Sequence, residues 1–195
     1  MTASILAALL LLAPITPETG KFTIRQDGRT IGTEEFTIRT IQSGYVAEGK
    51  TQLAGDPSPL TCKMEFDNNL KVVSYEYTHG SATIKIKVAQ PTSEMTLGDR
   101  GQESSTDFRF PDDGAILDNN FFHHYLLLLY RVKGANERFG VFVPQDMQVG
   151  EARVRSTGAR TFTLELGDLK LEATVDGNGR LTRLSVPSAK VVVER

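Results

Sequence analysis

The sequence contains no tryptophan and only one cysteine, Cys62, among its 195 residues. A single cysteine excludes an intramolecular disulfide. The absence of tryptophan removes a common stacking platform for carbohydrates, leaving tyrosine and phenylalanine for that role. Neither sign of charge dominates, because 22 Lys and Arg against 24 Asp and Glu give a net charge of −2. This balance excludes a general attraction to nucleic acid, so no nucleic-acid partner is expected.

Recognisable catalytic motifs are also missing. The sequence has no Gly-x-Ser-x-Gly or Ser-x-x-Lys arrangement of a serine nucleophile. It also has no glycine-rich phosphate loop that follows a strand and opens a helix. We therefore expect a protein that is not an enzyme and needs no cofactor. A hydrolase of envelope glycans or lipids is the enzymatic alternative.

The first 17 residues carry no charged side chain. Within them, residues 5–13 form an apolar run that is too short for a membrane span, which needs about 20 residues. Its length is typical of the hydrophobic region of a signal peptide. We therefore expect residues 1–18 to be a signal peptide and residues 19–195 to form one domain. The expected location is the periplasm or the extracellular space.

After residue 20, apolar and polar residues alternate with the period of a half-buried strand. In Thr30–Ile41, for example, Phe36 and Ile38 share one face and Glu35 lies on the other. Short turns such as Asp176–Gly179 separate about a dozen such segments, and links this short require antiparallel pairing. The expected fold is therefore mainly β, a single antiparallel meander that curls into an open or half barrel.

One segment, Asn119–Val132, breaks the alternation. It is apolar on almost every side, follows the helix-capping residues Asp118–Asn120, and ends before Gly134. We expect a helix here that covers the concave face of the sheet. Either it packs fully into the core, or part of it lines a cavity for an apolar ligand. The lining residues expected for such a cavity are Phe121, Phe122, Tyr125, Leu126 and Leu129, with Tyr75 and Tyr77 from the sheet.

No metal site is expected from the remaining polar residues. His123 and His124 are adjacent and would point about 100° apart on a helix, so chelation of one metal is not predicted. They are interpreted as polar groups at the solvated end of the helix. Cys62 has apolar neighbours at alternate positions and is interpreted as a small buried side chain. Glu34 and Glu35 must face opposite sides of a strand, and the sequence shows no partner for Glu35 should it face the interior.

Two short motifs carry a resemblance to known proteins. The segment 28–36 reads Gly-Arg-Thr-Ile-Gly-Thr-Glu-Glu-Phe, and 179–187 reads Gly-Arg-Leu-Thr-Arg-Leu-Ser-Val-Pro. With these motifs the chain resembles uncharacterised exported bacterial β-rich proteins, and its plan is similar to the open barrels of the outer-membrane lipoprotein carrier (Lol) type. The resemblance implies an apolar concave face that shields acyl chains.

The leading hypothesis is thus an exported protein that binds a lipid, a lipoprotein acyl chain or another apolar ligand. The alternative is a structural or protein-interaction module of the cell envelope, with a packed core and an envelope protein as partner. Residues 131–160 contain six Lys or Arg and three Asp or Glu. An ordinary solvated face is the favoured interpretation of this local excess, and peripheral contact with anionic membrane headgroups is the alternative.

Overall fold

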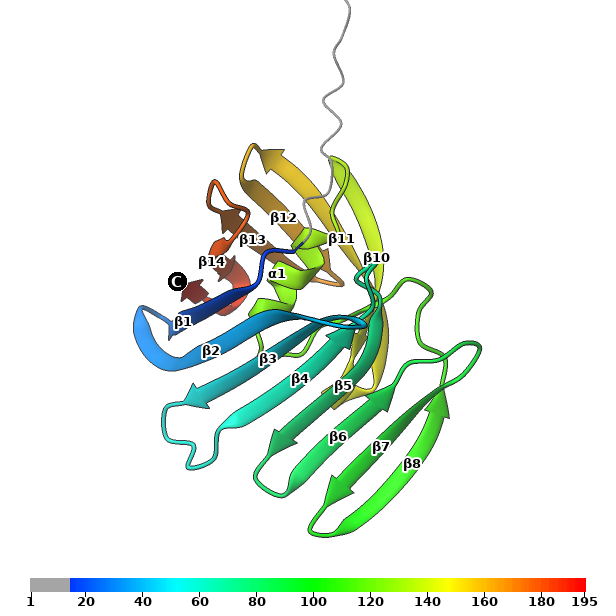
Figure 1. Cartoon of the computed structure of the whole chain (residues 1–195). Helices are drawn as coiled ribbons and strands as arrows, with labels where there is room; N and C mark the ends of the chain where they lie inside the picture. Colours follow the sequence, from blue (N-terminus) through cyan, green and yellow to red (C-terminus); the bar gives the residue numbers. More distant parts are fainter. Residues whose placement is uncertain (1–14) are drawn as a thin grey trace, which may run out of the picture.

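The computed structural model describes residues 15–195, and the apolar run at 5–13 lies outside that range. The structure is mainly β, with one α-helix (Figure 1). The elements are β1 (Glu18–Gln26), β2 (Arg29–Ile41), β3 (Gly44–Leu53), β4 (Leu60–Phe66), β5 (Val72–His79), β6 (Ala82–Lys87), β7 (Ser93–Asp99), β8 (Gln102–Phe108), β9 (Ala115–Ile116), α1 (His123–Tyr130), β10 (Asn136–Val143), the 3₁₀ helix η1 (Pro144–Asp146), β11 (Gln148–Gly158), β12 (Thr161–Leu166), β13 (Leu169–Val175), β14 (Leu181–Val186), the 3₁₀ helix η2 (Pro187–Ala189) and β15 (Val191–Glu194).

All fifteen strands belong to one curled, open sheet with β8 and β9 at its edges. The chain runs outward from β1 to β8, crosses to β9 and β10, and returns strand by strand to β15. There β15 pairs with β1 in antiparallel register, through Ile24 and Val193 among others. The expected open meander is confirmed in outline, with more strands than the dozen predicted.

One pairing differs from the prediction that every pair is antiparallel. The two-residue strand β9 pairs in parallel with β10, Ala115 facing Val141. A parallel pair needs a long crossover, and the segment containing α1 provides it. The sequence does not reveal β9, because two residues carry no readable period.

Helix α1 lies on the concave side of the sheet, as expected (Figure 1). It is shorter than the predicted Asn119–Val132. Asn120 donates its backbone N–H to the Asp118 side chain in a tight turn, so the helix begins only at His123. At the other end, Arg131 and Val132 donate to carbonyls three residues back, which closes the last turn. Within residues 15–195, no helix is both long and apolar enough to cross a membrane.

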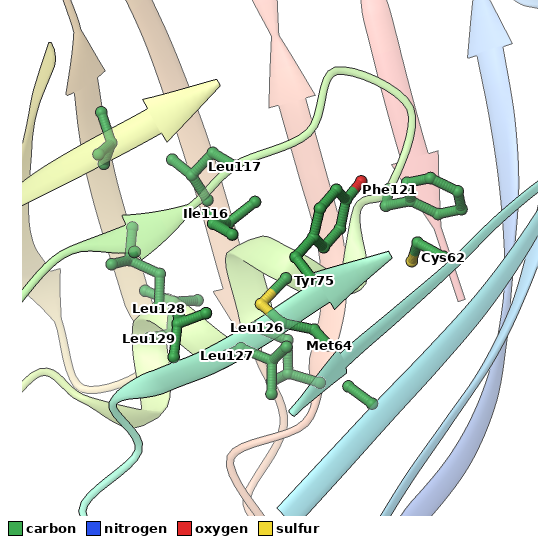
Figure 2. Close-up of a cluster of buried hydrophobic side chains, with 14 of the residues drawn as sticks. Cys62, Met64, Tyr75, Ile116, Leu117, Phe121, Leu126, Leu127, Leu128 and Leu129 are labelled. Atoms are coloured by element: carbon green, nitrogen blue, oxygen red, sulfur yellow. The ribbon is translucent and has the colours of Figure 1, made fainter. Parts of the chain in front are cut away.

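The core lies between α1 and the inner face of the sheet. Four consecutive leucines of α1, at 126–129, are buried with inward side chains of β2, β4 and β5. Figure 2 shows these leucines beside Met64 and Tyr75 of the sheet. At about 1.5–3 kcal/mol for each fully buried large apolar side chain, this face is the main source of the helix's stability.

Candidate functional site

The seven residues expected to line a ligand cavity fall into two groups in the structure. Five are buried in the packed core, namely Phe121, Leu126, Leu129, Tyr75 and Tyr77. Phe122 and Tyr125 are instead partly exposed and face cavities beside α1. Phe122 and Tyr125 are three residues apart and therefore lie on the same side of the chain at the start of α1.

Two cavities of about 640 and 270 Å³ lie beside the start of α1. They share three lining residues, Asn119, Tyr125 and Leu169, and are therefore neighbours; the two cavities together are here called the helix groove. The larger cavity lies over β10 to β13, with Leu117, Val141, Val143, Val149 and Leu166 among its apolar residues. The smaller cavity is lined by residues of β1 to β3 and β13 to β15 together with Phe122.

The walls of the helix groove differ in charge along its length. Within the described chain, no residue that lines the smaller cavity is charged. Tyr125 also adds no charge near neutral pH, since the tyrosine hydroxyl ordinarily ionises near pH 10 and burial raises its pKa to about 12. The larger cavity is lined by three carboxylates and one guanidinium, from Asp146, Glu151, Glu165 and Arg153. The smaller cavity is therefore lined by neutral residues, and the larger one has an acidic lining.

A second site lies under the beginning of α1 and centres on Glu34. This β2 side chain is fully buried, whereas Glu35 points outward and pairs with Lys21 at 2.8 Å. The Glu34 carboxylate accepts the backbone N–H groups of Phe122 (2.7 Å) and His123 (3.4 Å), and also bonds to Nδ1 of His123. A strand residue thus caps the helix, and the expected role of residues 118–120 as helix caps was wrong.

His123 and His124 do not lie at a solvated helix end, which corrects the prediction. Both are buried, and their ring centroids are 4.6 Å apart. Their Nε2 atoms lie 3.9 and 3.6 Å from Sγ of Cys62, which is buried on β4. Side-chain torsions bring together two imidazoles that the helix geometry alone sets about 100° apart. Cys62, His123 and His124 are called the thiol–imidazole cluster below.

The hydrogen bonds show which ring nitrogen of each histidine in this cluster carries the hydrogen. The Asp118 backbone N–H can only donate, so Nδ1 of His124 accepts it at 3.2 Å. Nε2 of neutral His124 then carries the hydrogen that faces Cys62. On the other side, the Glu34 carboxylate accepts from Nδ1 of His123, which leaves Nε2 as an acceptor for the thiol. Each group in the series Glu34–His123–Cys62–His124–Asp118 therefore has a hydrogen-bond partner of matching type.

Burial controls the ionisation of the groups in this hydrogen-bonded series. It raises the pKa of the Cys62 thiol well above its usual value, and the carboxylates of Glu34 and Asp118 raise it further. Burial together with the neighbouring His123 lowers the pKa of His124 far below its usual value. The thiol and the His124 imidazole are thus both neutral at pH 7. A buried neutral thiol is a poor nucleophile, so the arrangement does not favour cysteine catalysis.

The network continues to a second carboxylate, Asp118. Its Oδ2 accepts hydrogen bonds from the Tyr75 hydroxyl and the Gln145 amide. Burial raises the pKa of Asp118, although these bonds act in the opposite direction. Within residues 15–195, Oε1 of Gln145 is a buried acceptor with no partner. Tyr75 therefore serves this network and not the predicted ligand cavity.

Close packing between strand and helix depends on Gly49 of β3. A Cβ atom at this position would lie 2.5 Å from Cε1 of His123 and 3.0 Å from Phe121. The absence of a side chain at Gly49 lets α1 approach close enough for His123 to reach both Glu34 and Cys62.

Comparisons with known proteins bear on the fold alone. No family model matches the chain, and no curated protein matches it. A solved structure of a DUF1089 family protein from Pseudomonas aeruginosa is similar, with a TM-score of 0.50. Its sequence is 11% identical, and the match covers 80% of this chain and 90% of that one. The chain therefore shares an overall fold with that protein.

Proposed function

We propose that this chain is an exported protein, not an enzyme, that holds one acyl chain of a lipid or lipoprotein in the helix groove. The observation that carries the proposal is the pair of neighbouring cavities that share Tyr125 and Leu169, the smaller of which has no charged residue in its lining. Volumes of about 640 and 270 Å³ are in the range that ligand pockets occupy. A packed interaction module has no need of such a groove.

Exposed side chains of the helix groove support an apolar occupant. Val149 and Leu169 both line the larger cavity and are 59% and 49% exposed. Large exposed apolar side chains that line a cavity are typical of a ligand-binding surface. An acyl chain gains about 0.8 kcal/mol for each methylene group that it buries, so micromolar affinity, about 8 kcal/mol, takes about ten buried methylenes and more once the cost of association is included.

The charges around the larger cavity favour a neutral headgroup. Three carboxylates and one guanidinium surround the larger cavity, and Glu151 pairs with both Arg153 (3.1 Å) and Arg138 (3.8 Å). The local excess of basic residues in the sequence is thus partly neutralised here. We expect a monoacylglycerol to bind a few times more tightly than the free fatty acid of the same chain length, because exposed charges interact weakly.

A direct test compares two lysine substitutions at equally exposed apolar positions. Leu169→Lys places an ammonium group at the junction of the two cavities, whereas Val73→Lys, at a site 46% exposed, lies on β5 away from the groove. Displacement of a fluorescent fatty-acid analogue by a monoacylglycerol measures the affinity. Leu169→Lys should weaken binding at least about tenfold, since a charge in an apolar cavity is costly. Equal affinities in the two variants would refute the placement.

A further inference from the structure

The thiol–imidazole cluster contains three donors of the kinds that bind transition metals. The Cys62, His123 and His124 donor atoms all lie within 4.8 Å of one another, and all three residues are buried. Thiolate and imidazole suit zinc and other borderline or soft ions, whereas magnesium and calcium prefer oxygen ligands. The donor set therefore selects a narrow class of ion.

The spacing of the donors fits a tetrahedral ion. Zinc binds sulfur at about 2.3 Å and imidazole nitrogen at about 2.0–2.1 Å, which places the sulfur and nitrogen ligands of a tetrahedron about 3.6 Å apart. The observed distances from Sγ of Cys62 are 3.6 Å to His124 and 3.9 Å to His123. Both sulfur–nitrogen distances are thus within a few tenths of an ångström of the tetrahedral value, and all three donor atoms lie within 4.8 Å of one another.

Glu34 supplies the carboxylate partner that the non-ligating ring nitrogen of a metal-binding histidine usually has. Histidine ligands usually donate their second ring N–H to a carboxylate, which fixes the ring and its tautomer. The Glu34 carboxylate bonds to Nδ1 of His123, so Nε2 is turned toward the cluster. A divalent ion would also balance the charges of a Cys62 thiolate and of the buried Glu34 carboxylate.

One bond must change for His124 to act as a ligand. In the structure its Nδ1 accepts the Asp118 N–H at 3.2 Å, which puts the ring hydrogen on Nε2. Metal binding at Nε2 requires the other tautomer, with hydrogen on Nδ1. That bond is then lost, and Asp118 must turn an acceptor toward the ring. Metal binding is thus coupled to a local rearrangement at Asp118, Tyr75 and Gln145.

We propose that Cys62, His123 and His124 bind one Zn²⁺ ion, with Glu34 as the positioning carboxylate and a fourth coordination position left for water or a small ligand. The site is distinct from the helix groove, so zinc binding can be confirmed or refuted independently of acyl-chain binding. Formation of the zinc–sulfur bond releases the thiol proton to solvent. No oxidant or reductant is required.

Cobalt titration of the whole purified protein tests the proposal. The protein is stripped with chelator under reducing conditions, and Co²⁺ is added both to the folded chain and during refolding, because the cluster is buried. The expected result is a thiolate-to-cobalt charge-transfer band with the visible bands of tetrahedral Co²⁺, saturating at one ion per chain and lost on adding Zn²⁺. A folded protein that shows no such band by either route overturns the proposal.

Variants then locate the ion. Cys62→Ser should abolish the charge-transfer band, and His124→Asn should prevent saturation at the same stoichiometry. Glu34→Gln should weaken zinc roughly ten- to a hundredfold, as for other outer-shell partners. His79→Asn is the matched control, since this histidine pairs with Asp56 on the surface, and it should bind like the wild type. Circular dichroism verifies folding. A band unchanged by His124→Asn, or lost in His79→Asn, contradicts the site.

Discussion

Replacement of Glu34 by glutamine tests how the sheet holds the helix. The glutamine has nearly the same shape but no charge, and its NH₂ group is a donor. The Glu34 carboxylate accepts from the Phe122 N–H, the His123 N–H and His123 Nδ1. A glutamine oxygen cannot serve all three, and at least one buried donor will face another donor.

The expected loss is about 3–5 kcal/mol, and it is the sum of two effects. Each orphaned buried donor costs about 1–3 kcal/mol, and the charge-assisted bonds that remain become neutral ones. In a domain of this size, 1 kcal/mol shifts Tm by about 2–4 °C, so Tm should fall by roughly 10 °C.

Thermal and urea unfolding, followed by circular dichroism, provide the assay. Glu35→Gln is the matched control on the same strand, because Glu35 is exposed and its only ion pair is the surface contact with Lys21. It should leave Tm unchanged within error. A Glu34→Gln protein as stable as the control would refute the argument that Glu34 caps α1 from the sheet.

Three further predictions follow from other contacts. Because burial and His123 lower the pKa of His124, the unfolded chain takes up a proton near pH 6.5 that the native chain does not. The free energy of unfolding should therefore fall by up to about 1.4 kcal/mol per pH unit below that point, and His124→Gln should remove this slope in urea melts between pH 7.5 and 5.5. Gly49→Ala should lower Tm by several degrees through its clash with His123, whereas Gly177→Ala, with nothing within 4 Å, should not. If the chain is exported as proposed, burial of Glu18 in β1 and of Ile15 in the core predicts cleavage before residue 15 and not at the expected boundary after residue 18; a mature mass that begins at residue 19 would contradict this.

Strand periodicity made most of the fold predictable. Alternation in β2 placed Phe36 and Ile38 inward, and the turn at 176–179 joins β13 to β14 as expected. The pattern could not reveal which strands meet across long sequence distances, because registry between β1 and β15 depends on tertiary contacts. The two-residue strand β9 carries no periodic signal at all.

The buried polar network was harder to foresee than the apolar groove. The alternation already placed Glu34 on the inner face with Phe36, so a buried carboxylate could have been inferred, and its partner had to come from elsewhere. His123 lies 89 positions along the chain from Glu34, and only the crossover of α1 brings them together. Helix geometry alone also misjudged the two histidines, since rotation about their side-chain torsions closes the gap between the rings.

The predicted cavity residues show a further limit of prediction from the sequence pattern. Residue type identified the correct helix but could not separate Phe122 and Tyr125, which line the helix groove, from Leu126 and Leu129, which fill the core. A helix that is apolar on every side offers no stripe from which to choose a face.

Native mass spectrometry of the protein, purified gently from an envelope extract, tests the central claim most directly. Binding of an acyl chain predicts one adduct of lipid mass per chain in the wild type and in Val73→Lys, lost on delipidation and absent from Leu169→Lys. A clean mass for the wild-type protein, unchanged after incubation with a monoacylglycerol, would contradict the claim.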